Sequence, residues 1–331
     1  MKKIYSIQVL RVICSIFIII NHIDYYNVHK IGAIGVDIFL VISGFVAMLS
    51  PEKKMMMYLK KRLKKLVPLY YFLTIIIIIV YTISGSMFTS TINYKNIISS
   101  FLFLPMKDTL PILYVGWTLN YILIFYIIFS FSLKVSYRFR GIICIVILLI
   151  VVILIDNISI LNLMFGFDSM ILIEFIYGIL LYYIYIYFRI YGKKSNLIML
   201  MVVILLFPII INYVEISNII GLNGNIRSFY LGIPATIYCF LFLFSIKSDE
   251  KSKINRFILN CADLTYYIYL IHPIIVRGII KVLPNKVSSV LSINLLILTI
   301  ILIVICFIIS FVLSKIFMIS NVNKRFDRNL K

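Results

Sequence analysis

The amino-acid sequence predicts an all-α membrane protein that crosses a bilayer about ten times. Hydrophobic residues make up 63% of its 331 residues, and the mean hydropathy is +1.10. Soluble domains are typically about 45–50% apolar. The apolar residues form runs of the length that spans a bilayer as a helix. The predicted spans cover residues 7–23, 32–50, 66–83, 114–132, 141–156, 168–187, 196–213, 228–246, 264–281 and 290–317.

The distribution of basic residues orients these spans. The formal net charge is +20, and 24 of the 32 Lys and Arg residues lie in the N-terminal segment, the tail and four loops that face the cytosol when the N-terminus is cytosolic. Basic residues accumulate on the cytosolic side of membrane proteins. The charge therefore records topology, with some attraction to anionic lipid headgroups, and it does not indicate nucleic-acid binding. Both termini are predicted to be cytosolic.

The spans are expected to form one domain over residues 1–331, because no low-complexity linker divides the chain. The first span is interpreted as a permanent helix, since Arg11 lies inside it and it has no small-residue cleavage site. Segment 84–113 is the longest outer connection and is expected to hold a surface or re-entrant element. The five cysteines are odd in number and four lie in spans, so no disulfide framework is indicated.

Two ionisable residues lie within the first span. Arg11 and His22 are eleven residues apart, which is about 16 Å along a helix at 1.5 Å per residue. An ionisable group at membrane depth costs of order 3 kcal/mol on insertion scales and is usually functional. Arg11 is expected near the cytosolic face and His22 near the outer end. The alternatives without a catalytic role are a buried ion pair between Arg11 and Glu174, and an interfacial position for His22.

Asp37 is predicted to lie at the same depth as His22, because a short loop joins the first two spans. A carboxylate beside an imidazole fixes its tautomer and stabilises the imidazolium, as a general base requires. The alternative is that Asp37 caps a helix or pairs with another group. A metal site at His22, Asp24 and His29 is not expected, because His29 falls in a loop without supporting carboxylates at ligand spacing.

Five motifs, in the same order, resemble those of the acyltransferase-3 family of membrane proteins. They are Arg11 with His22, which match an Arg-x10-His signature, and residues 35–45, 61–70, 117–126 and 263–273. Each match alone is weak, but together they are specific and reach position 280. Two positions depart from the family pattern. Lys65 replaces an arginine and loses the planar guanidinium fork, and Ile122 replaces a glutamate, whose role Glu174 would have to take.

The resemblance implies a ten-helix enzyme that moves an acyl group, most often acetyl, from cytosolic acyl-CoA to a hydroxyl of an envelope carbohydrate. Acetyl-CoA would be a substrate rather than a bound cofactor, and no metal is expected. His22, oriented by Asp37, would be the general base, while Arg11 would contact the donor or stabilise oxyanion charge. Direct transfer and a covalent acyl-enzyme are both open. The composition, rich in Ile, Lys and Asn, fits an AT-rich bacterial genome, and the protein is expected to be integral to the bacterial plasma membrane.

Two further groups are candidate substrate contacts. A basic cluster at the start of the third span is expected to hold CoA phosphates, with ordinary cytosolic anchoring as the alternative: Lys61, Arg62, Lys64 and Lys65. An aromatic and amide group at the outer start of the fourth span suits a sugar ring, with membrane-belt packing as the alternative: Trp117, Asn120 and Tyr121. His272 precedes Pro273 and is expected to satisfy a carbonyl freed by the proline, not to act in catalysis.

Two other functions compete with acyl transfer. A polytopic transporter or flippase of an envelope glycan precursor would also have many spans and buried charges. Transporters often have repeated halves with broken helices at matching positions, and no such repeat is found in this sequence. A relative that has lost catalysis and acts as a membrane sensor is the third possibility, and only Ile122 favours it.

Overall fold

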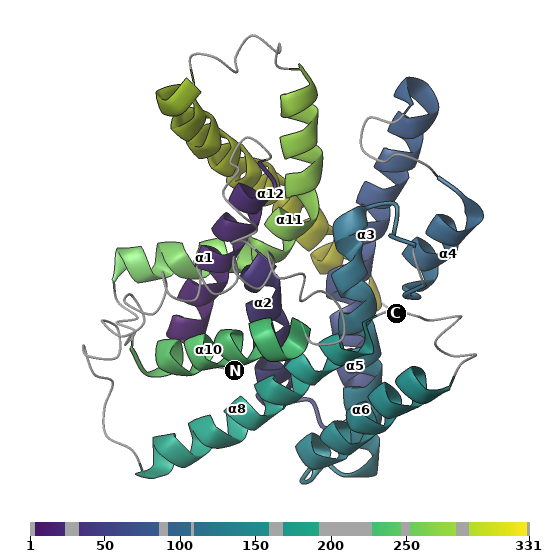
Figure 1. The fold of residues 1–331 in the computed structure, drawn as a ribbon, viewed down its shortest axis with the longest axis vertical. Coiled ribbons are helices and arrows are strands. Elements are labelled where there is room, and N and C mark those ends of the chain that lie inside the picture. Colours follow the sequence, from purple (N-terminus) through teal and green to yellow (C-terminus); the bar gives the residue numbers. More distant parts are fainter. Residues whose placement is uncertain are drawn as a thin grey trace.

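We describe the protein from a computed structural model, which describes residues 4–23, 33–85, 92–106, 109–158, 168–191, 227–245, 252–282 and 291–329. All its regular elements are helices (Figure 1). They are α1 (Tyr5–Asn21), α2 (Ala33–Met48), α3 (Met55–Ser84), α4 (Tyr94–Leu102), η1 (Tyr114–Gly116), α5 (Trp117–Val135), α6 (Arg140–Asn157), η2 (Ser169–Ile171), α8 (Leu172–Tyr191), the π-helix η3 (Ser228–Gly232), α10 (Ile233–Ser245), α11 (Lys253–Val282) and α12 (Leu291–Asn329).

In the described part of the chain, seven helical segments are long and apolar enough to cross a membrane. The helices α1 and α2 are also apolar but shorter, at 17 and 16 residues. The all-α membrane class is therefore confirmed. Nine of the ten predicted spans coincide with these helices. The predicted span at 196–213 lies outside the described residues, so the count of ten stays a prediction.

The long connection predicted at 84–113 contains the helix α4. Its first turn carries a reciprocal cap: the N–H of Asn96 donates to Asn93 Oδ1, and the N–H of Asn93 donates to Asn96 Oδ1, each at 3.0 Å. This arrangement satisfies two backbone donors of the first turn. Asn96 also donates to the carbonyl of Leu110, and Ser100 accepts from the N–H of Ile112, both at 2.8 Å. The helix is thereby fixed to the segment that leads into α5.

The helices α2 and α8 cross in backbone contact. A Cβ atom added to Gly44 would lie 2.3 Å from the carbonyl oxygen of Phe175, and one added to Gly178 would lie 2.1 Å from that of Val41. Only glycine fits at such a crossing, and small residues commonly allow membrane helices to approach this closely. The crossing fixes the face of α2 that carries Asp37.

The helix α1, which carries Arg11 and leads into His22, is enclosed by other helices. It packs against α2, α10 and α11, and in Figure 1 the purple helices α1 and α2 lie near the centre of the molecule. Leu10 and Ile19 on α1 are fully buried. Because α1 runs alongside both α2 and α11, its polar residues face protein on more than one side.

Candidate active site

A cavity of about 190 Å³ lies between α1, α2, α3, α5 and α11. Three cationic side chains line it: Arg11 from α1, and Arg62 and Lys65 from α3. Most of the remaining lining is apolar, with hydroxyl groups from α2, α5 and α11. The structure therefore gathers Arg11 and two members of the predicted basic cluster around one cavity among the membrane helices.

Arg11 is held by neutral side chains. Its Nη1 donates to Gln8 Oε1 at 3.0 Å, and its Nη2 donates to Thr265 Oγ1 at 2.8 Å. The alternative of an ion pair with Glu174 is not found: the charged neighbours of Glu174 include Asp37 and Arg227, and both of its carboxylate oxygens lack a hydrogen-bond partner among the described residues. The charge of Arg11 therefore borders the cavity on two neutral acceptors, with Asp263 as an acidic neighbour.

The basic cluster on α3 divides into two parts. The guanidinium of Arg62 lies 5.1 Å from the ring centre of Tyr58 and 5.3 Å from that of Tyr126, within the range of cation–π attraction. These rings fix Arg62 beside the cavity. Lys61 is not among the lining residues; its side chain is 67% exposed and forms an ion pair with Glu52.

The ion pair at Glu52 belongs to the loop between α2 and α3. Partial burial would raise the pKa of Glu52, but hydrogen bonds from Lys61 and Ser50 outweigh it and lower the pKa to about 2. Glu52 therefore stays ionised at neutral pH and retains Lys61 on the surface.

His22 follows the last residue of α1, where its ring is anchored to the backbone. Nδ1 lies 2.7 Å from the carbonyl oxygen of Ile18. A carbonyl only accepts, so this bond assigns the proton of the neutral ring to Nδ1 and makes Nε2 the basic nitrogen. The ring centre lies 4.7 Å from that of His272, with 71° between the planes, and 5.8 Å from that of Tyr114.

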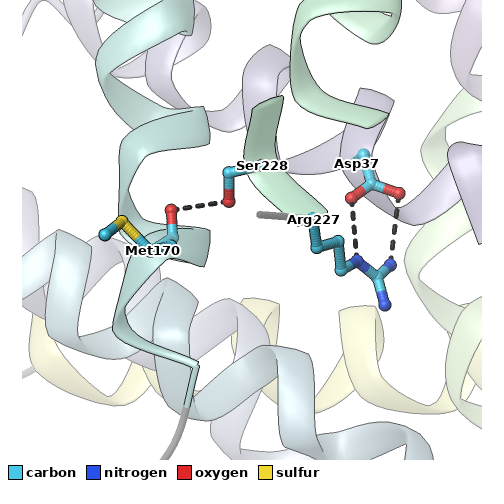
Figure 2. A network of polar contacts seen from close by, with 4 residues as sticks. All are labelled: Asp37, Met170, Arg227 and Ser228. Atoms are coloured by element: carbon cyan, nitrogen blue, oxygen red, sulfur yellow. Dashed lines mark hydrogen bonds and ion pairs between the residues drawn. The ribbon is translucent and has the colours of Figure 1, made fainter. Parts of the chain in front are cut away.

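Asp37 does not orient His22. Both of its oxygens accept hydrogen bonds from Arg227, from Nε and Nη2, each at 3.2 Å (Figure 2). The residue after Arg227 is tied as well, because Ser228 Oγ donates to the carbonyl of Met170 at 2.6 Å. The predicted pairing is corrected for a geometric reason: equal depth does not place two residues on facing sides of their helices. Asp37 faces η3 and α8, and His22 faces α11.

Arg227 was missed from the sequence, although a signal exists. It stands at the predicted outer end of the eighth span, where the positive-inside pattern does not call for a cation. Its guanidinium lies 5.6 Å from the ring centre of Trp117, and the rings of Trp117 and Tyr121 meet at 88° with centres 5.8 Å apart. Two predicted acceptor contacts therefore lie together, beside the Arg227–Asp37 pair.

Asn120, the third predicted acceptor contact, faces elsewhere. Its side chain is 1% exposed, and Nδ2 lies 3.5 Å from Ser99 Oγ on α4. Ile122 lines the cavity with Arg11. Glu174 does not line that cavity, so it does not replace the missing carboxyl there.

Tyr269 connects the cavity to the two histidines. It lines the cavity, and its ring centre lies 5.9 Å from that of His272. Its hydroxyl donates to the carbonyl of Val115 at 2.9 Å and lies 2.7 Å from Thr118 Oγ1. Within the described ranges, no group of three or more His, Cys, Asp or Glu could hold a metal ion; Asp24 and His29 lie outside those ranges.

These features define a polytopic helical membrane protein with a cationic cavity among its helices and a pair of histidines beyond one end of that cavity. The model of the acyltransferase-3 family, described as an acyltransferase domain, matches residues 4–315. The chain therefore belongs to this family of membrane acyltransferases, as its five motifs indicate. No match was found among curated proteins or among solved structures.

Proposed function

We propose that the protein transfers an acyl group, most simply acetyl, from cytosolic acyl-CoA to a hydroxyl of an envelope carbohydrate. The observation that carries this proposal is the shared cavity of Arg11, Arg62 and Lys65. Cationic side chains hold phosphate oxygens through charge-assisted hydrogen bonds. A cavity of about 190 Å³ is small beside the roughly 300–1,000 Å³ of sites for drug-sized ligands. It suits the narrow pantetheine arm, with the nucleotide left at the cytosolic mouth.

His22 is the general base of the proposed reaction. Its Nε2 removes the proton of the acceptor hydroxyl, while Nδ1 stays bonded to the carbonyl of Ile18. The hydroxyl oxygen forms a bond to the thioester carbonyl carbon, the carbon–sulfur bond breaks, and the CoA thiolate takes the proton from the His22 imidazolium. These bond changes and proton transfers are complete without a covalent acyl-enzyme. The rings of Trp117 and Tyr121 supply an apolar face for the sugar.

Arg11 contributes to donor binding rather than to the reacting carbonyl. It is eleven residues from His22 on one helix, which is about 16 Å at 1.5 Å per residue. Two groups so far apart do not contact one carbonyl carbon. Loss of Arg11 should therefore weaken binding of acyl-CoA, whereas loss of His22 should remove the chemical step.

The test uses the full chain in proteoliposomes with labelled acetyl-CoA and envelope glycan. His22→Ala is expected to lower kcat at least about 100-fold, the usual contribution of a general base. Arg11→Met and Arg62→Met are expected mainly to raise KM for acetyl-CoA. Lys60→Met, an exposed change on the same face of the membrane, is the matched control. Full activity of a correctly inserted His22→Ala protein would refute the proposal, and glycan transport without acyl consumption would favour a transporter.

A further inference from the structure

His272 is a buried imidazole beside His22 that the reaction above leaves without a role. It is 0% exposed on α11, and the two ring centres are 4.7 Å apart. Nδ1 lies 3.1 Å from the carbonyl oxygen of Ile268, so the proton of the neutral ring is on Nδ1. Nε2 is buried and has no hydrogen-bond partner among the residues that the structure describes.

The two histidines are anchored in the same way from different helices. Each ring bonds through Nδ1 to the carbonyl four residues earlier in its own helix, which is Ile18 for His22 and Ile268 for His272. In both neutral rings the basic nitrogen is therefore Nε2. A buried acceptor without a partner is unfavourable, so packing alone would be served better by an apolar ring at position 272.

The two rings cannot easily be positively charged at the same time. Two imidazolium rings with centres 4.7 Å apart would repel each other where water does not screen them. Among the described residues, the other ionisable groups around the pair are Tyr114 on η1 and Tyr269 and Arg277 on α11. The guanidinium of Arg277 lies 4.4 Å from the ring centre of Tyr114 and adds a further positive charge. At most one of the two rings is therefore charged at a time, and both are neutral before His22 accepts the hydroxyl proton.

We propose that neutral His272 is a positioning residue that stabilises the imidazolium of His22 during acyl transfer. The inference rests on the proposed function, in which His22 accepts the hydroxyl proton and later passes it to the CoA sulfur. Asp37 is bonded to Arg227 and does not support that charge. The neutral ring of His272, with an electron pair on Nε2 and its centre 4.7 Å from that of His22, supplies the dipole instead. The proton itself stays on His22, so no further reactant is needed.

The first experiment compares variants of the full chain in proteoliposomes. Removing the dipole makes the charged form of His22 less favourable. A tenfold change in the equilibrium between the charged and neutral rings corresponds to one pH unit. His272→Phe, which keeps a ring but removes both nitrogens, is expected to lower kcat about tenfold and to move the acid limb of the kcat profile to lower pH by about one unit. The KM for acetyl-CoA should change less than about twofold. His272→Gln retains an acceptor and should restore part of both effects.

Ile275→Val, a buried change on the same helix, is the matched control and should leave kcat and its pH profile unchanged. If His272→Phe folds and either keeps the kcat of the unmodified protein or loses activity without moving the acid limb, the role of His272 is only structural and the inference is overturned. Failure of the unmodified protein to transfer acyl groups would instead overturn the proposed function, so the two failures are distinguishable.

A second measurement does not depend on a variant of His272. Solid-state ¹⁵N NMR of the histidine-labelled protein reports the tautomer of each ring, and the chain has three histidines. His22→Gln and His29→Gln proteins assign the signals. A neutral His272 with its proton on Nδ1 is the expected result. A charged His272, or one with its proton on Nε2, would overturn the inference even if His272→Phe fails to fold.

Discussion

The two partners of the ion pair between Arg227 and Asp37 differ in burial and in their charged neighbours. The effect of this difference on stability can be tested by substituting each partner. The side chain of Asp37 is 0% exposed, whereas that of Arg227 is 27% exposed. Arg227 also has Glu174 as a second acidic neighbour. Arg227→Met would leave the carboxylate of Asp37 buried without its cation. Asp37→Asn would leave Arg227 beside Glu174 and partly in reach of solvent.

The magnitudes follow from that difference. Removing one partner of a buried ion pair typically destabilises a protein by about 3–5 kcal/mol, and we expect Arg227→Met to fall in this range. Asp37→Asn loses hydrogen bonds to a charged group, worth about 1.5–3 kcal/mol, and should fall at the lower end because Glu174 remains. The double variant has neither partner charge and should be more stable than Arg227→Met.

The assay is unfolding of the purified protein in a mild detergent, with acyl transfer measured on the same samples. Lys134→Met, at an exposed position, controls for the loss of a cation. Equal destabilisation by the two single variants, or a change below about 1 kcal/mol for Arg227→Met, would refute the reasoning. Loss of transfer by Asp37→Asn with unchanged stability would show that Asp37 acts in the chemistry and not only as the partner of Arg227.

Two further predictions concern the cavity and the cytosolic loop. Ile122→Glu should be tolerated, because Arg11 lines the same cavity, whereas Leu123→Glu, in the apolar core one residue later, should abolish folding; the yield of monodisperse protein in detergent distinguishes them. The lowered pKa of Glu52 means that its contact with Lys61 stabilises the fold at neutral pH, and that this contribution is lost as pH falls from 4.5 toward about 2. Lys61 is 67% exposed, so the contribution should be below about 1 kcal/mol. It is measured as the stability difference from Glu52→Gln, which should shrink in acid; a difference that grows in acid would contradict it.

Much of the fold follows from hydropathy, but the helix ends do not. The third predicted span begins at residue 66, yet α3 begins at Met55, and the ninth begins at 264, yet α11 begins at Lys253. Hydropathy detects the part of a helix that lies in lipid. The charged turns that precede it continue the same hydrogen-bonded helix outside the bilayer and carry no apolar signal.

The sequence brought together some of the side chains that the structure groups, but it missed the partner of Asp37. Arg11 and Arg62 line one cavity although they are on different helices. Asp37, by contrast, pairs with Arg227, which is 190 residues away. Position along a helix gives depth from 1.5 Å per residue, but the direction of a side chain depends on how each helix is rotated. That rotation is set here by contacts such as the glycine crossing of α2 and α8, which no local pattern reveals.

The position of Tyr269 limits how the donor reaches the acceptor. Its side chain lines the donor cavity, and its ring lies 5.9 Å from that of His272. Tyr269 therefore borders both the cavity and the ring of His272, and its hydroxyl is held by Thr118 and the carbonyl of Val115. In the proposed reaction, an acyl group carried on pantetheine would pass this side chain to meet the hydroxyl that His22 activates. Under the proposed function, α1 would bind the donor at Arg11 and start the chemistry at His22, eleven residues further along the chain.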